Sequence, residues 1–152
     1  MPFKSKIKGS TFERDLTELL NTHILRSLWK RVPLSGAIGT LLGEPELQGD
    51  VKGTVESFNK QFRIEAKVGY CGATQLTLKK EWLDKIIADS ANSNSIPLMV
   101  GKFSGAREGT KVFVAMDLGT FCALLNRSTE LYEEVLGYER KEMERSSSVL
   151  HG

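Results

Sequence analysis

Cysteine is scarce in this 152-residue chain, and long apolar runs are missing. The two cysteines, Cys71 and Cys122, are too few for a disulfide framework, so we expect reduced thiols and a cytoplasmic protein. No run approaches the roughly 20 apolar residues that span a bilayer, and no signal-peptide pattern opens the sequence. A glycine-rich phosphate loop of the Walker type is also missing. We therefore expect neither a membrane partner nor a nucleotide cofactor.

Histidine is scarce as well. His23 and His151 lie far apart in the sequence, and His151 belongs to the tail. Cys71 has no basic partner at a recognisable spacing. The sequence therefore argues against a zinc site, a histidine general base and a cysteine nucleophile.

Charge of both signs is plentiful but unevenly distributed. With 40% apolar and 26% charged residues, the chain has the composition of one ordinary globular domain. Residues 1–116 hold 17 Lys and Arg against 12 Asp and Glu, whereas residues 117–152 hold 4 against 7. A basic surface suits the phosphate backbone of a nucleic acid. The same lysines would also fit an ordinary solvated surface, so charge alone leaves both interpretations open.

Apolar periodicity predicts a mixture of helices and strands. Ser10 and Glu13 have the spacing of a capping box, which predicts a helix at about residues 10–28. Residues 35–49 are predicted as a loop and residues 146–152 as a frayed end. The remaining predicted strands are 29–34, 50–58, 61–68, 96–103 and 111–116, and the remaining helices are 76–91, 117–126 and 129–145. This order favours an α/β fold with a mixed central β-sheet flanked by helices.

Two acids and a lysine form the most informative pattern. Asp50 and Glu65 fall in neighbouring predicted strands that are joined by a short turn. Side chains that face each other across antiparallel strands lie about 5 Å apart. Two carboxylates at that distance repel each other unless a cation lies between them, and Mg²⁺ prefers oxygen ligands. Lys67 projects from the same side of its strand as Glu65, where its ammonium group could orient a metal-bound water or balance charge on a phosphate.

Each of these residues also has a purely structural interpretation. Asp50 could be a turn acid, and Glu65 and Lys67 could be solvated residues of one strand. Glu13 could serve only as a helix cap, and Trp82 favours the core over stacking on DNA. The context favours a catalytic set, because an alternating strand, an acid in the strand before it and a charged helix cap occur together.

Taken in their order along the sequence, the cap residues Ser10 and Glu13, then Asp50, and then Glu65 and Lys67 resemble the motifs of a known family. This family is the archaeal-type Holliday junction resolvases of the PD-(D/E)xK nuclease superfamily. The likeness covers roughly residues 8–125. It implies a restriction-endonuclease-like nuclease core within a single domain, residues 1–152, with a C-terminal helical extension at about 129–146. The segments that carry it are residues 8–14 (KGSTFER), 31–36 (RVPLSG), 49–51 (GDV), 64–67 (IEAK) and 79–82 (KKEW).

The resemblance implies roles for the matching residues. Asp50, Glu65 and the backbone carbonyl of Ala66 would bind Mg²⁺, for which Mn²⁺ would substitute, and Glu13 would reach the same centre. Lys67 would act on the attacking water. The DNA backbone would be held by Lys8, Arg14, Lys30, Arg31, Lys79 and Lys80.

The resemblance also implies an activity. The protein would be a metal-dependent, structure-specific DNA endonuclease of recombination and repair that cuts four-way junctions as a homodimer, by paired symmetric nicks. Ser35 would lie on a loop near the scissile phosphate. Gly49 replaces the motif's proline, and the stretch between Ser35 and Asp50 is long for the family, which leaves substrate choice open. The alternatives are another PD-(D/E)xK repair or restriction-type endonuclease acting on duplex DNA, and a non-catalytic nucleic-acid-binding protein.

Overall fold

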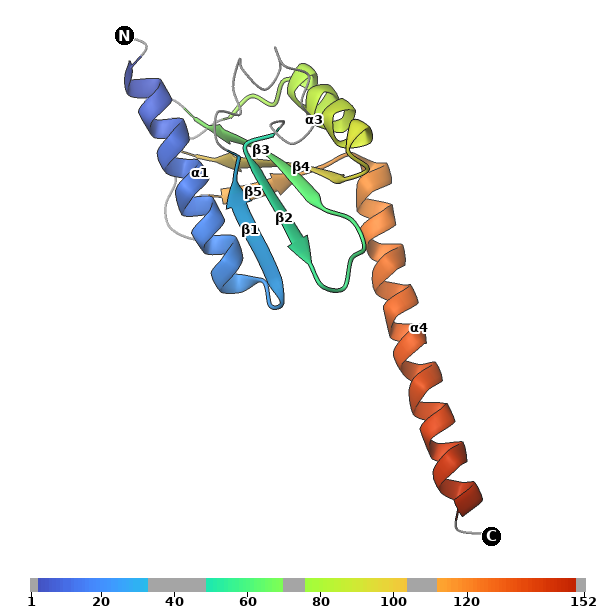
Figure 1. The fold of residues 1–152 in the computed structure, drawn as a ribbon. Coiled ribbons are helices and arrows are strands. Elements are labelled where there is room, and N and C mark those ends of the chain that lie inside the picture. The colour runs from blue at the N-terminus through green and yellow to red at the C-terminus, as the bar shows by residue number, and fades with distance from the viewer. Residues whose placement is uncertain (1–2, 33–48, 70–75, 104–111, 150–152) are drawn as a thin grey trace. The chain divides into compact units, whose positions relative to one another are not determined.

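The computed structural model describes residues 3–32, 49–69, 76–103 and 112–149 (Figure 1). The chain forms two compact units, Met1–Asp117 and Leu118–Gly152.

A five-stranded β-sheet forms the centre of the first unit, with its strands side by side in sequence order. The β3 and β4 strands are parallel, and every other neighbouring pair is antiparallel. Parallel neighbours need a crossover connection, and helix α3 (Lys80–Asn92) lies between them in the sequence. The predicted mixed sheet is therefore confirmed. The strands are β1 (Ser27–Arg31), β2 (Val51–Val55), β3 (Phe62–Val68), β4 (Ile96–Lys102) and β5 (Val112–Ala115).

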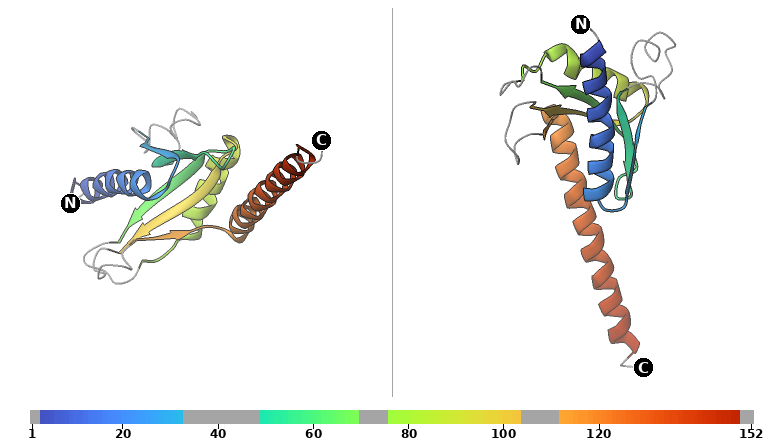
Figure 2. Two further views of the ribbon diagram at one scale, coloured as in Figure 1. Left: turned by 90° about the horizontal axis from the view of Figure 1, so that it is seen from below. Right: turned by 90° about the vertical axis from the view of Figure 1, so that its left-hand side faces the viewer.

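Two helices cover the sheet, one on each side (Figure 2). Helix α1 (Phe3–His23) packs against β1 and β3, and α3 packs against β3 and β4. Successive side chains of β3 point to opposite faces of the sheet, so this strand packs against both helices. Phe62 meets the ring of Trp29 with 5.7 Å between ring centres, whereas the Lys67 ammonium lies over the ring of Trp82 in α3. The face of β3 that carries Glu65 and Lys67 is therefore the α3 face.

The apolar core includes the face of the sheet that α1 covers. Phe12 and Leu16 are buried, four residues apart on one face of α1, as the apolar spacing predicts. Gly53 of β2 lies directly against Trp29, since a Cβ built at Gly53 would lie 2.2 Å from the indole Cε3 atom. Only glycine fits there, which explains a residue that would otherwise weaken a strand. The other buried apolar residues of the sheet include Val51, Phe62, Ile64, Met99 and Val100.

Helix α1 begins and ends earlier than the predicted helix at residues 10–28. It starts at Phe3, so Ser10 lies inside the helix and the predicted capping box is wrong. The Ser10 hydroxyl instead accepts a hydrogen bond from Arg31 Nη2 at 3.0 Å. The helix ends at His23, and the chain reverses at Arg26, whose φ of 51° is left-handed. The residues that follow enter β1.

The second unit contains one long helix, α4 (Leu118–Val149). The prediction of two helices with a frayed end from residue 146 is therefore wrong. Arg127 lies at the expected break, and its Nη1 bonds the carboxylates of Glu130 and Glu134 at 3.2 Å each, one and two turns further on. Such pairs support a continuous helix. None of the described helices is long and apolar enough to cross a membrane.

Candidate active site

Asp50 directly precedes β2, and it lies near enough to Glu65 of β3 for the charge of Glu65 to act on it. The register pairs Val51 with Ile64, and the Asp50 N–H donates to the Ile64 carbonyl at 2.8 Å. Antiparallel pairing of β2 with β3 therefore brings the segment that carries Asp50 beside β3, as the predicted strand pairing requires. Gly49, just before them, has a φ of 76°. Proline fixes its φ near −65°, so it could not adopt the φ of Gly49. The backbone therefore enters Asp50 by a path that the motif's proline would not allow.

Glu65 is buried, with 8% of its surface exposed. Its two carboxylate oxygens face two different lysines. Oε1 accepts a hydrogen bond from Lys67 Nζ at 2.5 Å, and Oε2 lies 3.7 Å from Lys85 Nζ. A carboxylate away from water requires such compensation, because an unpaired buried charge is strongly destabilising. The interpretation of Glu65 as a solvated strand residue is therefore wrong.

The pKa of Asp50 is raised from 3.8 to about 6. Burial is the largest cause because it penalises the charged form, and the charge of Glu65 raises the pKa further. The Ala66 N–H donates to Asp50 Oδ2 at 2.8 Å and opposes the shift, as does the charge of Lys67. A buried acid whose pKa is raised by a neighbouring carboxylate takes up a proton or a cation more readily than a surface acid would.

Glu13 of α1 lies near enough to Asp50 to act on it electrostatically. Its charge contributes to the raised pKa of Asp50. Its carboxylate Oε2 is held by Arg31, through Nη2 at 2.9 Å and Nε at 3.3 Å. Arg31, assigned from the sequence to the DNA backbone, thus has its guanidinium group on Glu13. The interpretation of Glu13 as only the partner of an N-cap is wrong, because Ser10 is not one.

Lys85 of α3 is a site neighbour that sequence reasoning missed. Besides its contact with Glu65, it donates a hydrogen bond to Asp89 Oδ2 at 3.0 Å. Burial alone would lower the pKa of Lys85, but Glu65 and Asp89 outweigh it, so the pKa is raised. The available sequence signal was the spacing of Trp82, Lys85 and Asp89, which places them on one face of α3.

Trp82 belongs to both the packing and the site. It is half-buried, so its assignment to the core is only partly right. Its ring centre lies 5.1 Å from Lys67 Nζ and 5.7 Å from Lys79 Nζ. Ammonium groups over an aromatic face are attracted by the ring quadrupole. The indole therefore keeps two cations beside the acidic centre.

The donor set suits a hard divalent cation. Asp50 and Glu65 offer carboxylate oxygens, with the backbone of Ala66 next in the chain. Within the described ranges, no three His, Cys, Asp or Glu side chains are close enough to hold an ion by themselves. An ion would therefore draw further ligands from backbone, water or phosphate oxygens. Mg²⁺ commonly binds in this way, with one or two carboxylates and several other oxygen ligands.

The predicted DNA contacts lie on the surface where they are described. Lys79 and Lys80, at the start of α3, each form an ion pair with an acid of that helix. Arg14 and Lys30 are exposed. The side chain of Lys8 and the whole of Ser35 lie outside the described residues, and so does the predicted loop at 35–49 up to residue 48.

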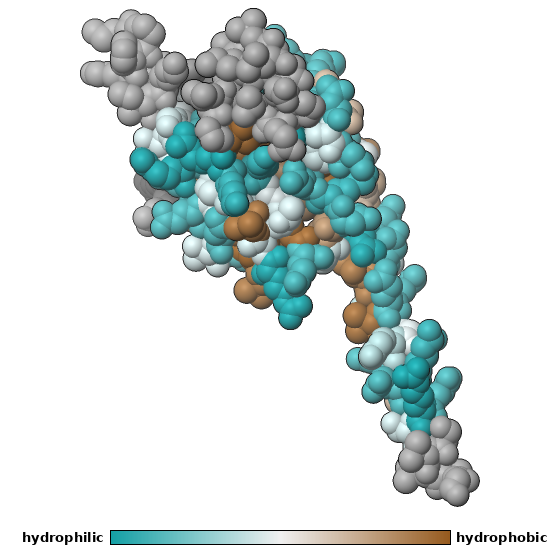
Figure 3. Space-filling model, viewed as in Figure 1, coloured by the Kyte–Doolittle hydropathy of each residue, from teal (hydrophilic) through white to brown (hydrophobic). Residues whose placement is uncertain are grey.

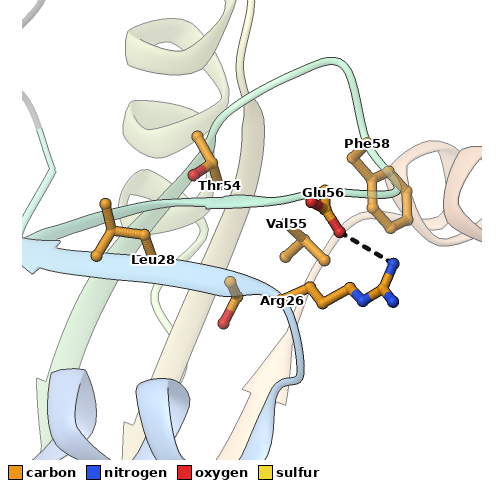
Figure 4. A pocket seen from close by; sticks show the side chains of 7 residues that line it. Arg26, Leu28, Thr54, Val55, Glu56 and Phe58 are labelled. Atoms are coloured by element: carbon orange, nitrogen blue, oxygen red, sulfur yellow. Dashed lines mark hydrogen bonds and ion pairs between the residues drawn. The ribbon is translucent and has the colours of Figure 1, made fainter.

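A hollow of about 660 Å³ lies at the other end of the β1–β2 pair (Figure 4). Arg26 and Glu56 form an ion pair of 3.3 Å at its edge, and both side chains are largely exposed. The hollow therefore lacks the buried acids that mark the Asp50 centre. Its lining residues are Arg26, Ser27, Leu28, Thr54, Val55, Glu56 and Phe58.

Comparison with protein families identifies the class of protein. Residues 4–150 match the family model described as "Phage putative PDDEXK endonuclease". The chain belongs to this family. The predicted superfamily is therefore confirmed, and membership of this family supports a nuclease.

One solved structure that is similar to this chain is that of Hjc from Archaeoglobus fulgidus, a Holliday junction resolvase. The two chains share 17% identity with a TM-score of 0.46, over 76% of this chain and 88% of that chain. No curated protein matches the sequence.

Proposed function

We propose that this protein is a divalent-metal-dependent DNA endonuclease that resolves four-way (Holliday) junctions by paired symmetric nicks. One observation carries the chemistry: Asp50, just before β2, and Glu65 of β3 are close enough for the charge of Glu65 to act on Asp50, and Lys67 is bonded to Glu65. The choice of a junction as substrate rests on the ordered motifs that resemble archaeal-type resolvases.

Asp50, Glu65 and the Ala66 carbonyl would hold Mg²⁺, with Mn²⁺ as a substitute. Such an ion, when bound, lowers the pKa of a coordinated water and offsets charge on phosphate oxygens. The raised pKa of Asp50 supports this assignment, because it reflects burial and repulsion between two neighbouring carboxylates. Either a proton or a cation relieves that repulsion, and at neutral pH protons are scarce.

Lys67 would position the attacking water and balance charge on the phosphate. Its ammonium group is 2.5 Å from Glu65 Oε1, at the edge of the acidic centre. Trp82, on its other side, keeps the ammonium close to this centre. By exchanging its bond to Glu65 for one to water or phosphate, Lys67 can serve the reaction without moving far.

Glu13 would act at the same centre from α1, either through water or on a second ion, with Arg31 fixing its position. Ser35 would lie near the scissile phosphate. Exposed basic residues would bind phosphates, which fixes the orientation of DNA without reading its bases. A two-fold homodimer would explain paired nicks, since each copy supplies one site.

The assay that tests the proposal compares a labelled four-way junction with a linear duplex of the same sequence, with and without Mg²⁺. We expect paired symmetric nicks in the junction only, and only with Mg²⁺. Asp50→Asn and Glu65→Gln should abolish cutting while junction binding is retained. Glu56→Gln changes an exposed acid just beyond the other end of β2 and should cut like the wild type.

Other outcomes would redirect the assignment. Cutting of both substrates would keep the nuclease centre and favour a repair or restriction-type enzyme on duplex DNA. Junction binding without cutting by the wild type would favour a non-catalytic nucleic-acid-binding protein. Loss of junction binding by Asp50→Asn in the absence of metal would mean that Asp50 is not a catalytic residue.

A further inference from the structure

Helix α4 carries a hollow on one of its faces, with a volume of about 590 Å³. At Gly137 the helix surface has no side chain, and a Cβ built there would meet nothing within 4 Å. Glycine inside a helix costs about 1 kcal/mol relative to alanine. Room for a side chain of a neighbouring helix is a physical reason for glycine at this position. The hollow is lined by Thr129, Tyr132, Glu133, Leu136, Gly137 and Arg140.

Exposed apolar residues lie on the same face of α4. Leu125, Tyr132 and Met143 follow one another at intervals of 7 and 11 residues, close to two and three whole turns. Their exposed fractions are 53%, 64% and 64%. Figure 3 shows apolar surface on the N-terminal part of α4, with mainly hydrophilic surface further along the helix in this view. An exposed apolar row on a long helix is typical of a surface that another protein chain covers.

Opposite charges flank the centre of the hollow. Glu133 and Arg140 are seven residues apart on this face, and Leu136 and Gly137 lie midway between them. Consider two antiparallel α4 helices related by a two-fold axis between Leu136 and Gly137. Leu136 of each copy then faces Gly137 of the other, and Glu133 of each faces Arg140 of the other.

This face therefore presents complementary charges to a second copy of itself, with room at Gly137 for Leu136 of the other copy. A two-fold interface requires that complementarity, because the same patch serves both copies. A parallel pair would instead set Glu133 against Glu133 and Arg140 against Arg140, which is repulsive. We propose that α4 joins two copies of this chain as an antiparallel helix pair centred between Leu136 and Gly137. The inference goes beyond the proposed function, which needs two sites but not any particular interface.

The test is the oligomeric state of the full chain, measured by sedimentation equilibrium over a hundredfold range of concentration, without DNA or metal. The wild type should be in monomer–dimer equilibrium. Glu133→Arg and Arg140→Glu should each weaken dimerisation by about tenfold or more, because two ion pairs become two repulsions. Helix content by circular dichroism should be unchanged in both variants.

Rescue separates the pairing from any structural damage. The double variant E133R/R140E restores both ion pairs and should dimerise like the wild type. An equimolar mixture of the two single variants should also dimerise. In the mixed dimer, position 133 of each copy again faces a charge of opposite sign at position 140 of the other copy. Glu142→Arg makes the same change of charge away from the hollow and should leave the dimer intact.

A wild type that stays monomeric throughout would overturn the proposal. So would single variants that dimerise as tightly as the wild type, or a mixture that does not recover. Because no DNA or metal is present, these results leave the proposed nuclease activity untouched, and a failed cleavage assay leaves the helix pairing untouched.

Discussion

Lys85 Nζ lies 3.7 Å from Glu65 Oε2, the carboxylate oxygen that Lys67 does not contact. Two lysines from different elements therefore compensate one buried acid. Lys67 comes from the same strand as Glu65, whereas Lys85 comes from α3 and also bonds Asp89. The arrangement suggests different roles, with Lys67 in the chemistry and Lys85 as a counter-charge that a metal ion would displace.

Substitution of each lysine by methionine should separate these roles. Lys67→Met should lower the cleavage rate by about 10²–10³-fold at any Mg²⁺ concentration, as expected for loss of a group that stabilises charge on the phosphate. Lys85→Met should keep the rate at saturating Mg²⁺ and lower the Mg²⁺ concentration for half-maximal cleavage by about threefold, since a partly exposed ion pair is weak. A Mg²⁺ titration of single-turnover cleavage measures both. An inactive Lys85→Met protein at saturating Mg²⁺ would place Lys85 in the chemistry instead.

The raised pKa of Asp50 predicts that the free energy of unfolding of the metal-free protein depends on pH. A folded-state pKa of about 6 against 3.8 means that the folded state holds this proton more tightly. Stability therefore falls as the pH rises from about 3.8 to about 6, by roughly 3 kcal/mol when the shift is complete. Asp50→Asn removes the charge and with it the cost.

Urea unfolding in EDTA at several pH values measures this cost. The free energy of unfolding of Asp50→Asn, relative to that of the wild type, should rise across this window and level off above it. Asp84→Asn changes an exposed acid of α3 and should track the wild type at every pH. A constant difference between Asp50→Asn and the wild type would show that Asp50 titrates normally.

The sequence could predict the parts of the site that depend on local periodicity. Alternation along β3 placed Glu65 and Lys67 on one face, and a short turn placed Asp50 beside that strand, although β2 begins one residue later than predicted, at Val51. Both follow from the two-residue repeat of a strand and from antiparallel pairing. The burial of Glu65 and the approach of Lys85 depend on how α3 crosses back over the sheet, which no local pattern specifies.

Helix ends were predicted poorly for a related reason. Ser10 and Glu13 have the spacing of a capping box, but their side chains meet Arg31 of β1, a partner that only tertiary packing supplies. The break expected near Arg127 is absent, because Arg127 joins successive turns of α4 through Glu130 and Glu134. A side chain that can form either a local cap or a tertiary contact does not specify a helix end until its partner is known.

Substitution of Arg31 and of Lys30 should distinguish the residue that positions Glu13 from the residue that contacts DNA. Arg31→Ala should slow cleavage by about tenfold or more while junction affinity changes little, because Glu13 loses its partner. Lys30→Ala removes an exposed charge and should weaken binding slightly with cleavage of bound DNA unchanged. Binding titrations and single-turnover rates separate the two effects. A larger loss of affinity than of rate for Arg31→Ala would make Arg31 a DNA contact first.

Gly53 and Gly9 should respond oppositely to alanine. At Gly53 the new Cβ would lie 2.2 Å from Trp29 Cε3, so the indole or β2 must move. We expect a loss of about 2–3 kcal/mol in the free energy of unfolding. At Gly9, inside α1, a Cβ meets nothing within 4 Å, and alanine should stabilise the protein by about 0.5–1 kcal/mol. Urea unfolding gives both values. A Gly53→Ala protein as stable as the wild type would mean that Trp29 can be accommodated elsewhere without cost.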